Sequence, residues 1–288
     1  MENQQKAFSL SIADFAIQLH SETLIELEDG YLPFLKNIVN KPDIDIECIA
    51  GWPEFSFDET QKVFEAKNET QKFYTIYSIN SELGFVIYNQ QTNEIQQIAL
   101  LNEHFNHWKV YSEPIDNIIM PLKYPMGPII MHYMTLTSDA VMMHASCAFD
   151  GEKGRMFSGF SGAGKSTMSM IWSEAGSQII NDDRLIIRKT ETGFNVHNTP
   201  MYYKDMPKVA PLSAVYLISH SPENKIKKLV GAMAVTRVMA FCIQNNFDKQ
   251  FIQKRLGIFT EISMQVPVYD LGFVPNQSVV HFIKAHEA

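Results

Sequence analysis

The stretch Gly159-Phe-Ser-Gly-Ala-Gly-Lys-Ser-Thr167 decides the fold, because it matches the phosphate-binding pattern G-x-x-x-x-G-K-[ST] of a Walker A loop (P-loop). In such a loop, backbone N–H groups point inward and hold the phosphates of a nucleotide. Glycine allows the positive-φ turns and the close backbone approach that this demands. We therefore expect a nucleotide-binding loop that is formed by Gly159, Ser161, Gly162, Ala163, Gly164, Lys165, Ser166 and Thr167.

Two side chains of this loop have separate expected roles. Lys165 can reach the outer phosphates as a point charge, and the Ser166 hydroxyl can ligate Mg²⁺. The residues before and after the loop also match the motif, which requires a strand and then a helix. Arg155 to Ser158 read as a short strand, and Ser166 to Ala175 carry apolar residues at helical spacing. A helix at this position directs its positive end toward the phosphates. The alternative, a surface turn that matches by chance, does not account for the flanking strand and helix.

Composition limits the classes of protein that the chain can belong to. It has 288 residues, 45% hydrophobic and 19% charged, which suits one large domain or two small ones. The net charge of −8 argues against nucleic acid as a broad electrostatic partner. Cys48, Cys147 and Cys242 are far apart and lack metal-ligand spacing, so we expect free thiols in a reducing compartment. No signal peptide or membrane-spanning segment is evident, which predicts a cytoplasmic protein that is not bound to membranes.

The chain reads as two regions. Residues 1–115 are rich in short β-runs and predict an antiparallel meander of unknown role, while residues 116–288 contain the phosphate loop. Asp43, Asp45 and Glu47 alternate with isoleucines, which indicates either a cation-binding face or a solvated strand face. In the second region we expect an α/β (α+β) fold. Its strands are expected at 141–149, 155–158, 178–180, 185–188, 194–197, 212–219 and 266–274, and its helices at 126–137, 166–175, 232–243, 248–264 and 277–285.

An apolar strand that ends in two acids follows soon after the phosphate loop. Asp182 and Asp183 close the run Ile179-Ile-Asn-Asp-Asp183, where a Walker B-type carboxylate is expected to face Mg²⁺. Consecutive side chains at a strand end point to opposite sides. One carboxylate could then contact the metal, and the other could contact an attacking hydroxyl. The alternative is an Asn-Asp turn between two strands.

Other side chains carry weaker signals. His144 lies in the apolar strand beside the one that leads into the loop, where a core histidine is the common alternative. Arg184 could pair with an aspartate or a phosphate, or could be a surface residue. The segment 199–204 could hold a peptide substrate or be an ordinary exposed loop.

The order of these motifs resembles the catalytic domain of bacterial HPr kinase/phosphorylase, which shares its fold with phosphoenolpyruvate carboxykinase. The resemblance rests on His144-Ala-Ser, the phosphate loop and the Asp182-Asp183 strand. The segments 211–217 and 266–280 look like the HPr kinase-like proteins often found beside peptide-modification genes. The resemblance covers about residues 140 to 282, and the first half is similar with weaker motifs.

This resemblance implies a kinase that uses ATP and Mg²⁺ to phosphorylate a hydroxyl, such as a serine of a peptide or small protein. Asp182 would accept the proton of the hydroxyl, and Asp183 and Ser166 would help bind Mg²⁺, although the two acids could exchange roles. His144 would lie against the acid/base aspartate or the transferred phosphate, and Lys165 would hold the phosphates. Two other functions stay open: a non-catalytic ATP-binding module that regulates a partner, and a small-molecule kinase. Assembly into a homo-oligomer is compatible with the resemblance.

The sequence also departs from the family pattern. The Gly-rich signature that follows the two aspartates in HPr kinases is not evident, and Glu191 is the only weak candidate for its acidic metal ligand. The sequence therefore gives no support for phosphorylase activity or for phosphorylation of HPr itself. The oxaloacetate-binding arginines of carboxykinases are also not evident.

Overall fold

The computed structural model describes residues 3–37, 41–243 and 249–287. The chain forms two compact units, the first of residues 1–138 and 200–206 and the second of residues 139–199 and 207–288. Residues 116–138, which we expected with the phosphate loop, are therefore part of the first unit. Among the described residues, no helix combines the length and the apolar character needed to cross a membrane.

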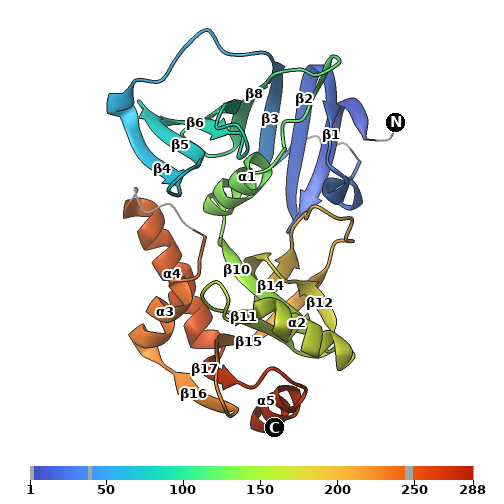
Figure 1. Ribbon diagram of the computed structural model, residues 1–288, viewed down its shortest axis with the longest axis vertical. Helices are drawn as coiled ribbons and strands as arrows, with labels where there is room; N and C mark the ends of the chain where they lie inside the picture. Colours follow the sequence, from blue (N-terminus) through green and yellow to red (C-terminus); the bar gives the residue numbers. More distant parts are fainter. Residues whose placement is uncertain (1–2, 38–40, 244–248, 288) are drawn as a thin grey trace. The chain divides into compact units, whose positions relative to one another are not determined.

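The first unit is built on one mixed β-sheet, which has nine strands within the described residues (Figure 1). The expected antiparallel meander is confirmed from β4 to β8. It does not extend to β3, which pairs in parallel with both β2 and β8. The strands are β1 (Gln4–Ile12), β2 (Phe15–Glu26), β3 (Ile44–Ala50), β4 (Lys62–Lys67), β5 (Lys72–Ile79), β6 (Glu82–Tyr88), β7 (Ile95–Leu101), β8 (His107–Ser112) and β9 (Ile118–Ile119).

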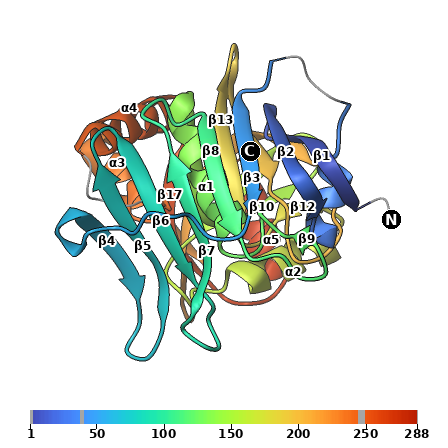
Figure 2. The same ribbon diagram turned by 90° about the horizontal axis from the view of Figure 1, so that it is seen from above.

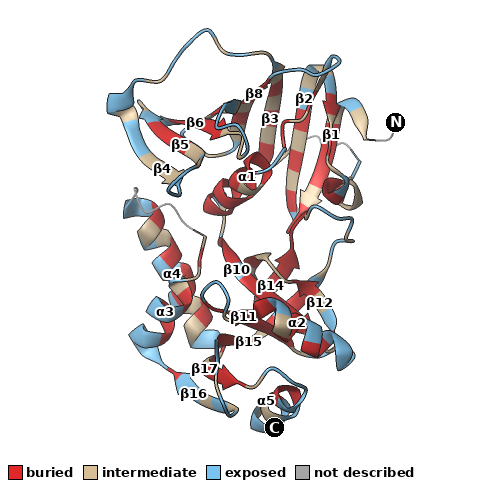
Figure 3. Ribbon diagram, in the orientation of Figure 1, coloured by how far each residue is buried: buried red, intermediate tan, exposed pale blue. Residues whose placement is uncertain are grey.

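The helix α1 (Met126–Met134) packs on this sheet and forms the core of the first unit. Tyr133 of α1 makes edge-to-face contacts with Phe85 of β6 and Trp108 of β8, and both of these aromatic side chains are fully buried. Figure 2 shows α1 beside these strands, and Figure 3 shows it buried on nearly all sides. The buried helix that the sequence predicts is thus present, but it supports the first unit. Short 3₁₀ helices lie at Asp29–Phe34, Glu59–Gln61 and Thr135–Thr137.

Five strands of the second unit pair into a closed ring, and the loop strand β11 is one of them. β11 pairs with β10 on one side and in parallel with β15 on the other, while β13 and β14 connect β10 to β15. All five residues of β11 are buried, as expected for a central strand. The strands are β10 (Ala140–Phe149), β11 (Gly154–Ser158), β12 (Gln178–Asn181), β13 (Arg184–Thr190), β14 (Gly193–Asn198), β15 (Val209–His220), β16 (Lys225–Leu229) and β17 (Val268–Phe273).

Helices cover both faces of this sheet and form two separate apolar cores. On one face, α3 and α4 contribute Val238, Phe259 and Ile262 to a cluster with β10, β13 and β15. On the other face, α2 and α5 contribute Trp172 and Ile283 to a second cluster. The helices are α2 (Lys165–Glu174), α3 (Gly231–Met239), α4 (Lys249–Gln265) and α5 (Ser278–Glu287) (Figure 1).

The α/β fold with a β-rich N-terminal region is confirmed, and most expected elements of the second unit lie within a few residues of their predicted bounds. One helix is shorter than expected, since α3 ends at Met239 instead of continuing to residue 243. The chain turns there because Cys242 forms a β-bridge with Met143 of β10. Asp248, the expected start of α4, lies outside the described residues.

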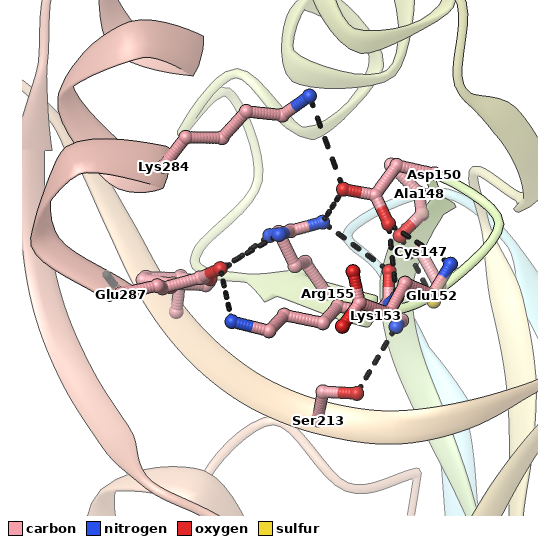
Figure 4. Close-up of polar contacts among 11 residues, drawn as sticks. Cys147, Ala148, Asp150, Glu152, Lys153, Arg155, Ser213, Lys284 and Glu287 are labelled. Carbon is pink, nitrogen blue, oxygen red and sulfur yellow. Dashed lines mark hydrogen bonds and ion pairs between the residues drawn. The ribbon is translucent and has the colours of Figure 1, made fainter.

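A buried arginine connects the loop strand to α5. The side chain of Arg155 in β11 is only 3% exposed and donates two hydrogen bonds to Glu287 of α5, at 2.9 and 2.6 Å (Figure 4). A third hydrogen bond of 2.7 Å runs from Arg155 to Asp150. The guanidinium also lies over the ring of Trp172, 4.8 Å from its centroid. A charge inside this core is tolerated because two carboxylates neutralise it.

The charges in this cluster shift the pKa of Glu287. Burial alone would raise the pKa of this carboxyl, but hydrogen bonds from Arg155 and Tyr216 hold it below its ordinary value of 4.5. A carboxyl with a lowered pKa in the folded state stabilises the fold above pH 4.5. This stabilisation is lost as the pH falls through the lower pKa of the folded state.

We expect Glu287→Ala to lower the free energy of unfolding by about 3–5 kcal/mol, because it leaves the buried Arg155 without its main partner. Urea unfolding at pH 7 measures this change. Glu152→Ala is the matched control, since Glu152 is an exposed acid in the turn between β10 and β11, close in sequence to Arg155, and its loss should cost less than about 0.5 kcal/mol. Equal stability of both variants would show that the Arg155–Glu287 pair contributes nothing.

Candidate nucleotide and phosphoryl-transfer site

The phosphate loop, residues 159–167, lies between β11 and α2, as the sequence predicts. Gly162 and Gly164 adopt left-handed backbone angles, with φ of 78° and 98°. Gly159 has no positive φ; its role is to make space, because a Cβ there would lie 2.8 Å from the carbonyl oxygen of Ile218. The two expected uses of glycine are thus both present: Gly162 and Gly164 make the positive-φ turns, and Gly159 permits close packing of the loop on β15.

The loop leads directly into α2, which begins at Lys165 after Gly164 as its N-cap. The first N–H groups of a helix have no partner within the helix, and the helix dipole adds partial positive charge there. Ser166 is exposed at this end, and its hydroxyl is accessible to a ligand. The arrangement suits a bound anion such as a phosphate chain.

Lys165 is folded back against the loop. Its Nζ donates hydrogen bonds to the carbonyl oxygens of Gly159 and Phe160, at 3.2 and 3.4 Å, and the residue is only 8% exposed. Burial lowers the pKa of Lys165, and the charge of Asp183 partly opposes that effect. The ammonium group therefore lies in the loop with little negative charge around it, which favours the binding of an anion there.

Asp182 and Asp183 lie in a bend between β12 and β13. The two alternatives from the sequence, an Asn-Asp turn and a pair of acids at a strand end, therefore describe the same segment. Asn181 fixes this bend, because its Oδ1 accepts hydrogen bonds from the backbone N–H of Asp182 at 2.7 Å and of Asp183 at 3.3 Å. The bend is also attached to β10, since the N–H of Ala145 donates to the carbonyl oxygen of Asp183. Both acids are partly exposed.

His144 and Asp183 meet next to the phosphate loop. Their Nε2 and Oδ1 atoms are 3.6 Å apart, and the other carboxylate oxygen of Asp183 lies 2.8 Å from Arg184. The register of β10 with β13 causes this, because it places His144 opposite Arg184. Arg184, weighed above as either an ion-pair or a surface residue, is thus paired. The histidine side chain faces Asp183, the acid that the resemblance assigns to the metal.

His144 has its pKa lowered from the ordinary value of 6.5. Burial is the largest cause, the charges of Lys165 and Arg184 act in the same direction, and Asp183 opposes them. The imidazole is therefore mainly neutral at pH 7. A neutral ring can accept or donate a hydrogen bond beside a phosphate without adding charge.

His220, which the sequence did not single out, supports the far side of the loop. Its Nε2 lies 3.2 Å from the carbonyl oxygen of Gly162, and its ring stacks on Phe273 with centroids 5.4 Å apart. A Cβ on Gly164 would lie 2.8 Å from Phe273 and 3.3 Å from His220. The only sequence signal was the position of His220 at the end of an apolar strand, which does not distinguish it from other surface histidines.

The other candidates have different surroundings. Glu191 follows the far end of β13, and six residues of strand separate it from Arg184 by about 20 Å. Asp45 lies 3.2 Å from His20 and 3.0 Å from His107 on the sheet of the first unit. Within the described ranges, no group of three or more His, Cys, Asp or Glu residues could hold a metal ion unaided. The acidic alternation at residues 43–47 lies on a partly exposed strand face, where Asp45 contacts both histidines and Glu47 lies 3.7 Å from Lys109.

Comparison with known proteins agrees with the motif order in the second unit. Residues 129–206 match the family model of phosphoenolpyruvate carboxykinase, a range that contains His144, the phosphate loop and both aspartates. The Hpr(Ser) kinase/phosphatase from Coxiella burnetii is similar in structure over 51% of this chain and 95% of that chain, with 9% identity and a TM-score of 0.30. No curated protein sequence matches the chain. By the family-model match, the segment that holds the site is carboxykinase-like, which agrees with the shared fold that the motif resemblance implied.

Proposed function

We propose that this protein is an HPr kinase-like phosphotransferase that uses ATP and Mg²⁺ to phosphorylate a hydroxyl, with a serine of a peptide or small protein as acceptor. One observation carries the proposal: Lys165, His144, Asp183 and Arg184 lie together beside a phosphate loop. A site that only binds nucleotide needs the loop alone. Acidic and basic side chains grouped at the outer-phosphate side indicate chemistry at the transferred group.

Each residue of the site has a separate proposed role in the reaction. The loop amides and Lys165 would hold the β- and γ-phosphates, and Asp182 would accept the proton of the acceptor hydroxyl as its oxygen bonds to the γ-phosphorus. The bond from that phosphorus to the bridging oxygen breaks, and ADP leaves with the electron pair. His144 would lie beside the transferred group through its contact with Asp183. Catalysis of this kind is mainly positioning and charge neutralisation.

The donors of the site also fit Mg²⁺. This ion keeps several waters and binds through one or two carboxylates together with substrate phosphates, so a cluster of three protein ligands is not required. Asp183 and the exposed Ser166 hydroxyl supply suitable oxygen atoms. When bound, Mg²⁺ would neutralise charge that develops on the phosphate oxygens.

The free cysteines agree with a cytoplasmic location. Cys48, Cys147 and Cys242 are all buried and unpaired by disulfides. Burial raises the pKa of each thiol, to about 12 for Cys147 and Cys242. Such thiols are unreactive and behave as small apolar side chains.

The proposal is tested by incubating a cell extract with γ-labelled ATP and the purified protein, then locating new phosphate by mass spectrometry. We expect labelled serine on a peptide or small protein, absent without the enzyme. A label found only on a small molecule would support a small-molecule kinase instead. Nucleotide binding without any transfer would support a non-catalytic ATP-binding module.

A further inference from the structure

A cavity of about 610 Å³ opens in the first unit, at the end of the sheet where β2, β3 and β8 finish and β7 begins. All the residues that line it fall within residues 1–138, so the cavity belongs to one compact unit. Its volume lies within the range of about 300–1,000 Å³ that is typical of ligand sites. None of the residues proposed above for phosphoryl transfer lines this cavity.

Gln97 of β7 lines the cavity with a buried amide that is only half paired. The residue is 1% exposed, and its Nε2 donates hydrogen bonds to Ser112 Oγ at 3.1 Å and to the carbonyl oxygens of Met120 and Pro121, both at 3.0 Å. Those two carbonyl acceptors fix the orientation of the amide. Its Oε1 has no hydrogen-bond partner within the described part of the chain. A buried acceptor without a partner is unfavourable, so a ligand that brings an N–H donor would be stabilised here.

The charged residues of the lining are mainly acidic. Glu26, Glu113 and Asp116 supply three carboxylates against one ammonium group, that of Lys123. The charge of Lys123 also acts on Glu28, where it opposes the rise in pKa that burial causes. Glu113 and Asp116 are exposed and form no ion pair with another residue that the structure describes. This excess of negative charge attracts a cation.

Exposed apolar side chains surround these acids. Trp52, Ile95 and Ile115 line the cavity although they are 42%, 47% and 73% exposed. The turn of residues 115–118 holds Ile115 in place, because its first and last residues exchange two backbone hydrogen bonds of 2.9 Å. Its two central residues have left-handed φ angles of 50° and 63°. The face of an indole ring attracts a cation, most often a guanidinium group.

We propose that this cavity binds an arginine side chain of a peptide partner. A guanidinium group is planar, donates hydrogen bonds to carboxylate and amide oxygens, and stacks on an indole, so it suits Glu113, Asp116, Gln97 and Trp52 together. The exposed isoleucines suit apolar residues beside the arginine, which a free amine does not carry. Such binding goes beyond the proposed function, because it gives the first unit a ligand and requires neither the phosphate loop nor a nucleotide.

Isothermal titration of the whole protein without nucleotide tests this, with the blocked peptide acetyl-Ala-Leu-Arg-Leu-Ala-amide as the probe. The same peptide with citrulline in place of arginine keeps the shape and removes the charge. We expect the arginine peptide to bind at least tenfold more tightly than the citrulline peptide, as a charge-assisted hydrogen bond predicts.

The double variant Glu113→Gln, Asp116→Asn should weaken binding of the arginine peptide about tenfold and leave the citrulline peptide unchanged. Asparagine tolerates the left-handed conformation of residue 116, so the turn should be kept. The matched control is Glu69→Gln, Glu103→Gln, which removes the same charge from exposed acids of the same unit that do not line the cavity.

Tryptophan fluorescence tests where the peptide binds. Trp52 is exposed, whereas Trp108 and Trp172 are fully buried, so acrylamide should quench mainly Trp52. The arginine peptide should protect the native protein from this quenching, and the citrulline peptide at the same concentration should not.

Four results would overturn the assignment. Equal affinity for the arginine and citrulline peptides, or no binding of either, would show that the charge is not recognised. Native affinity in the double variant would place the peptide elsewhere. Equal binding of a lysine peptide would indicate a site for any cation, and equal binding of agmatine would indicate a site for a small amine. No nucleotide takes part in these measurements, so their failure would leave the proposed phosphotransferase function standing.

Discussion

An Asp182→Asn variant is expected to lose phosphoryl transfer by a factor of about 10²–10⁴ while its affinity for ATP stays within about twofold of the native value. The amide has nearly the same shape as the carboxylate but cannot accept the proton of the acceptor hydroxyl. Since Asp182 is partly exposed and its backbone N–H bonds to Asn181, the substitution leaves the bend intact. The loss should therefore fall on kcat.

Asp183→Asn is the matched comparison, because the two acids are adjacent and differ in their partners. Asp183 contacts both His144 and Arg184, and its charge opposes the lowering of the pKa of Lys165. Its proposed role is to help bind Mg²⁺. We therefore expect Asp183→Asn to raise the Mg²⁺ concentration needed for half-maximal rate, whereas Asp182→Asn should leave that requirement unchanged.

Steady-state kinetics with labelled ATP at several Mg²⁺ concentrations separate these effects, with ATP affinity measured by titration. If Asp182→Asn shifts the Mg²⁺ requirement and Asp183→Asn removes turnover alone, the two acids have exchanged roles. If both variants retain native turnover, neither acid takes part in the reaction, and the proposed mechanism is wrong.

Replacing Lys165 by Met should weaken ATP and tripolyphosphate binding by on the order of a hundredfold or more. The reason is that each charge-assisted hydrogen bond to a phosphate contributes about 1.5–3 kcal/mol. Methionine keeps most of the volume of the buried side chain and removes only the charge. The native ammonium is buried with a lowered pKa, so the fold should not depend on it.

Isothermal titration measures the loss of affinity, and urea unfolding checks that the variant folds. Lys189→Ala, an exposed substitution on β13, serves as the control for removal of one positive charge. Unchanged affinity for tripolyphosphate in a folded Lys165→Met protein would show that the loop does not bind phosphates, and would remove the basis of the proposed function.

The phosphate loop and its neighbouring elements could be predicted because their signals are local. The glycine spacing of residues 159–164, the apolar period of α2 and the short alternating strands are all visible within a few residues. β2 is one of the longest strands, but the polar run of residues 20–23 interrupts its alternation, and its pairing with β3 depends on a distant segment, so nothing local predicts its full length. α1 was predicted as a helix, but nothing local showed which unit it would pack in.

The site could be predicted in part for the same reason. His144 and the two aspartates were singled out by their order along the chain, but their contacts depend on the register between β10 and β13. That register brings His144 to Asp183. His220 and Phe241 come near the loop only through the pairing of β15 with β11 and the bridge from Cys242 to Met143. Such long-range pairings leave no local pattern in a single sequence.

The path of the chain determines how the gene can be divided. Residues 200–206 belong to the first unit although they lie between two strands of the second. There, the carbonyl oxygen of Met201 occupies the place where a Cβ on Gly30 would be, and Lys204 pairs with Asp29. A gene fragment that starts at codon 139 would therefore encode the whole second unit together with residues 200–206, which would lack their packing partners in the first unit. The two units can be exchanged only by joining the chain at three places, so the unit that holds the phosphate loop cannot be transferred as one continuous segment.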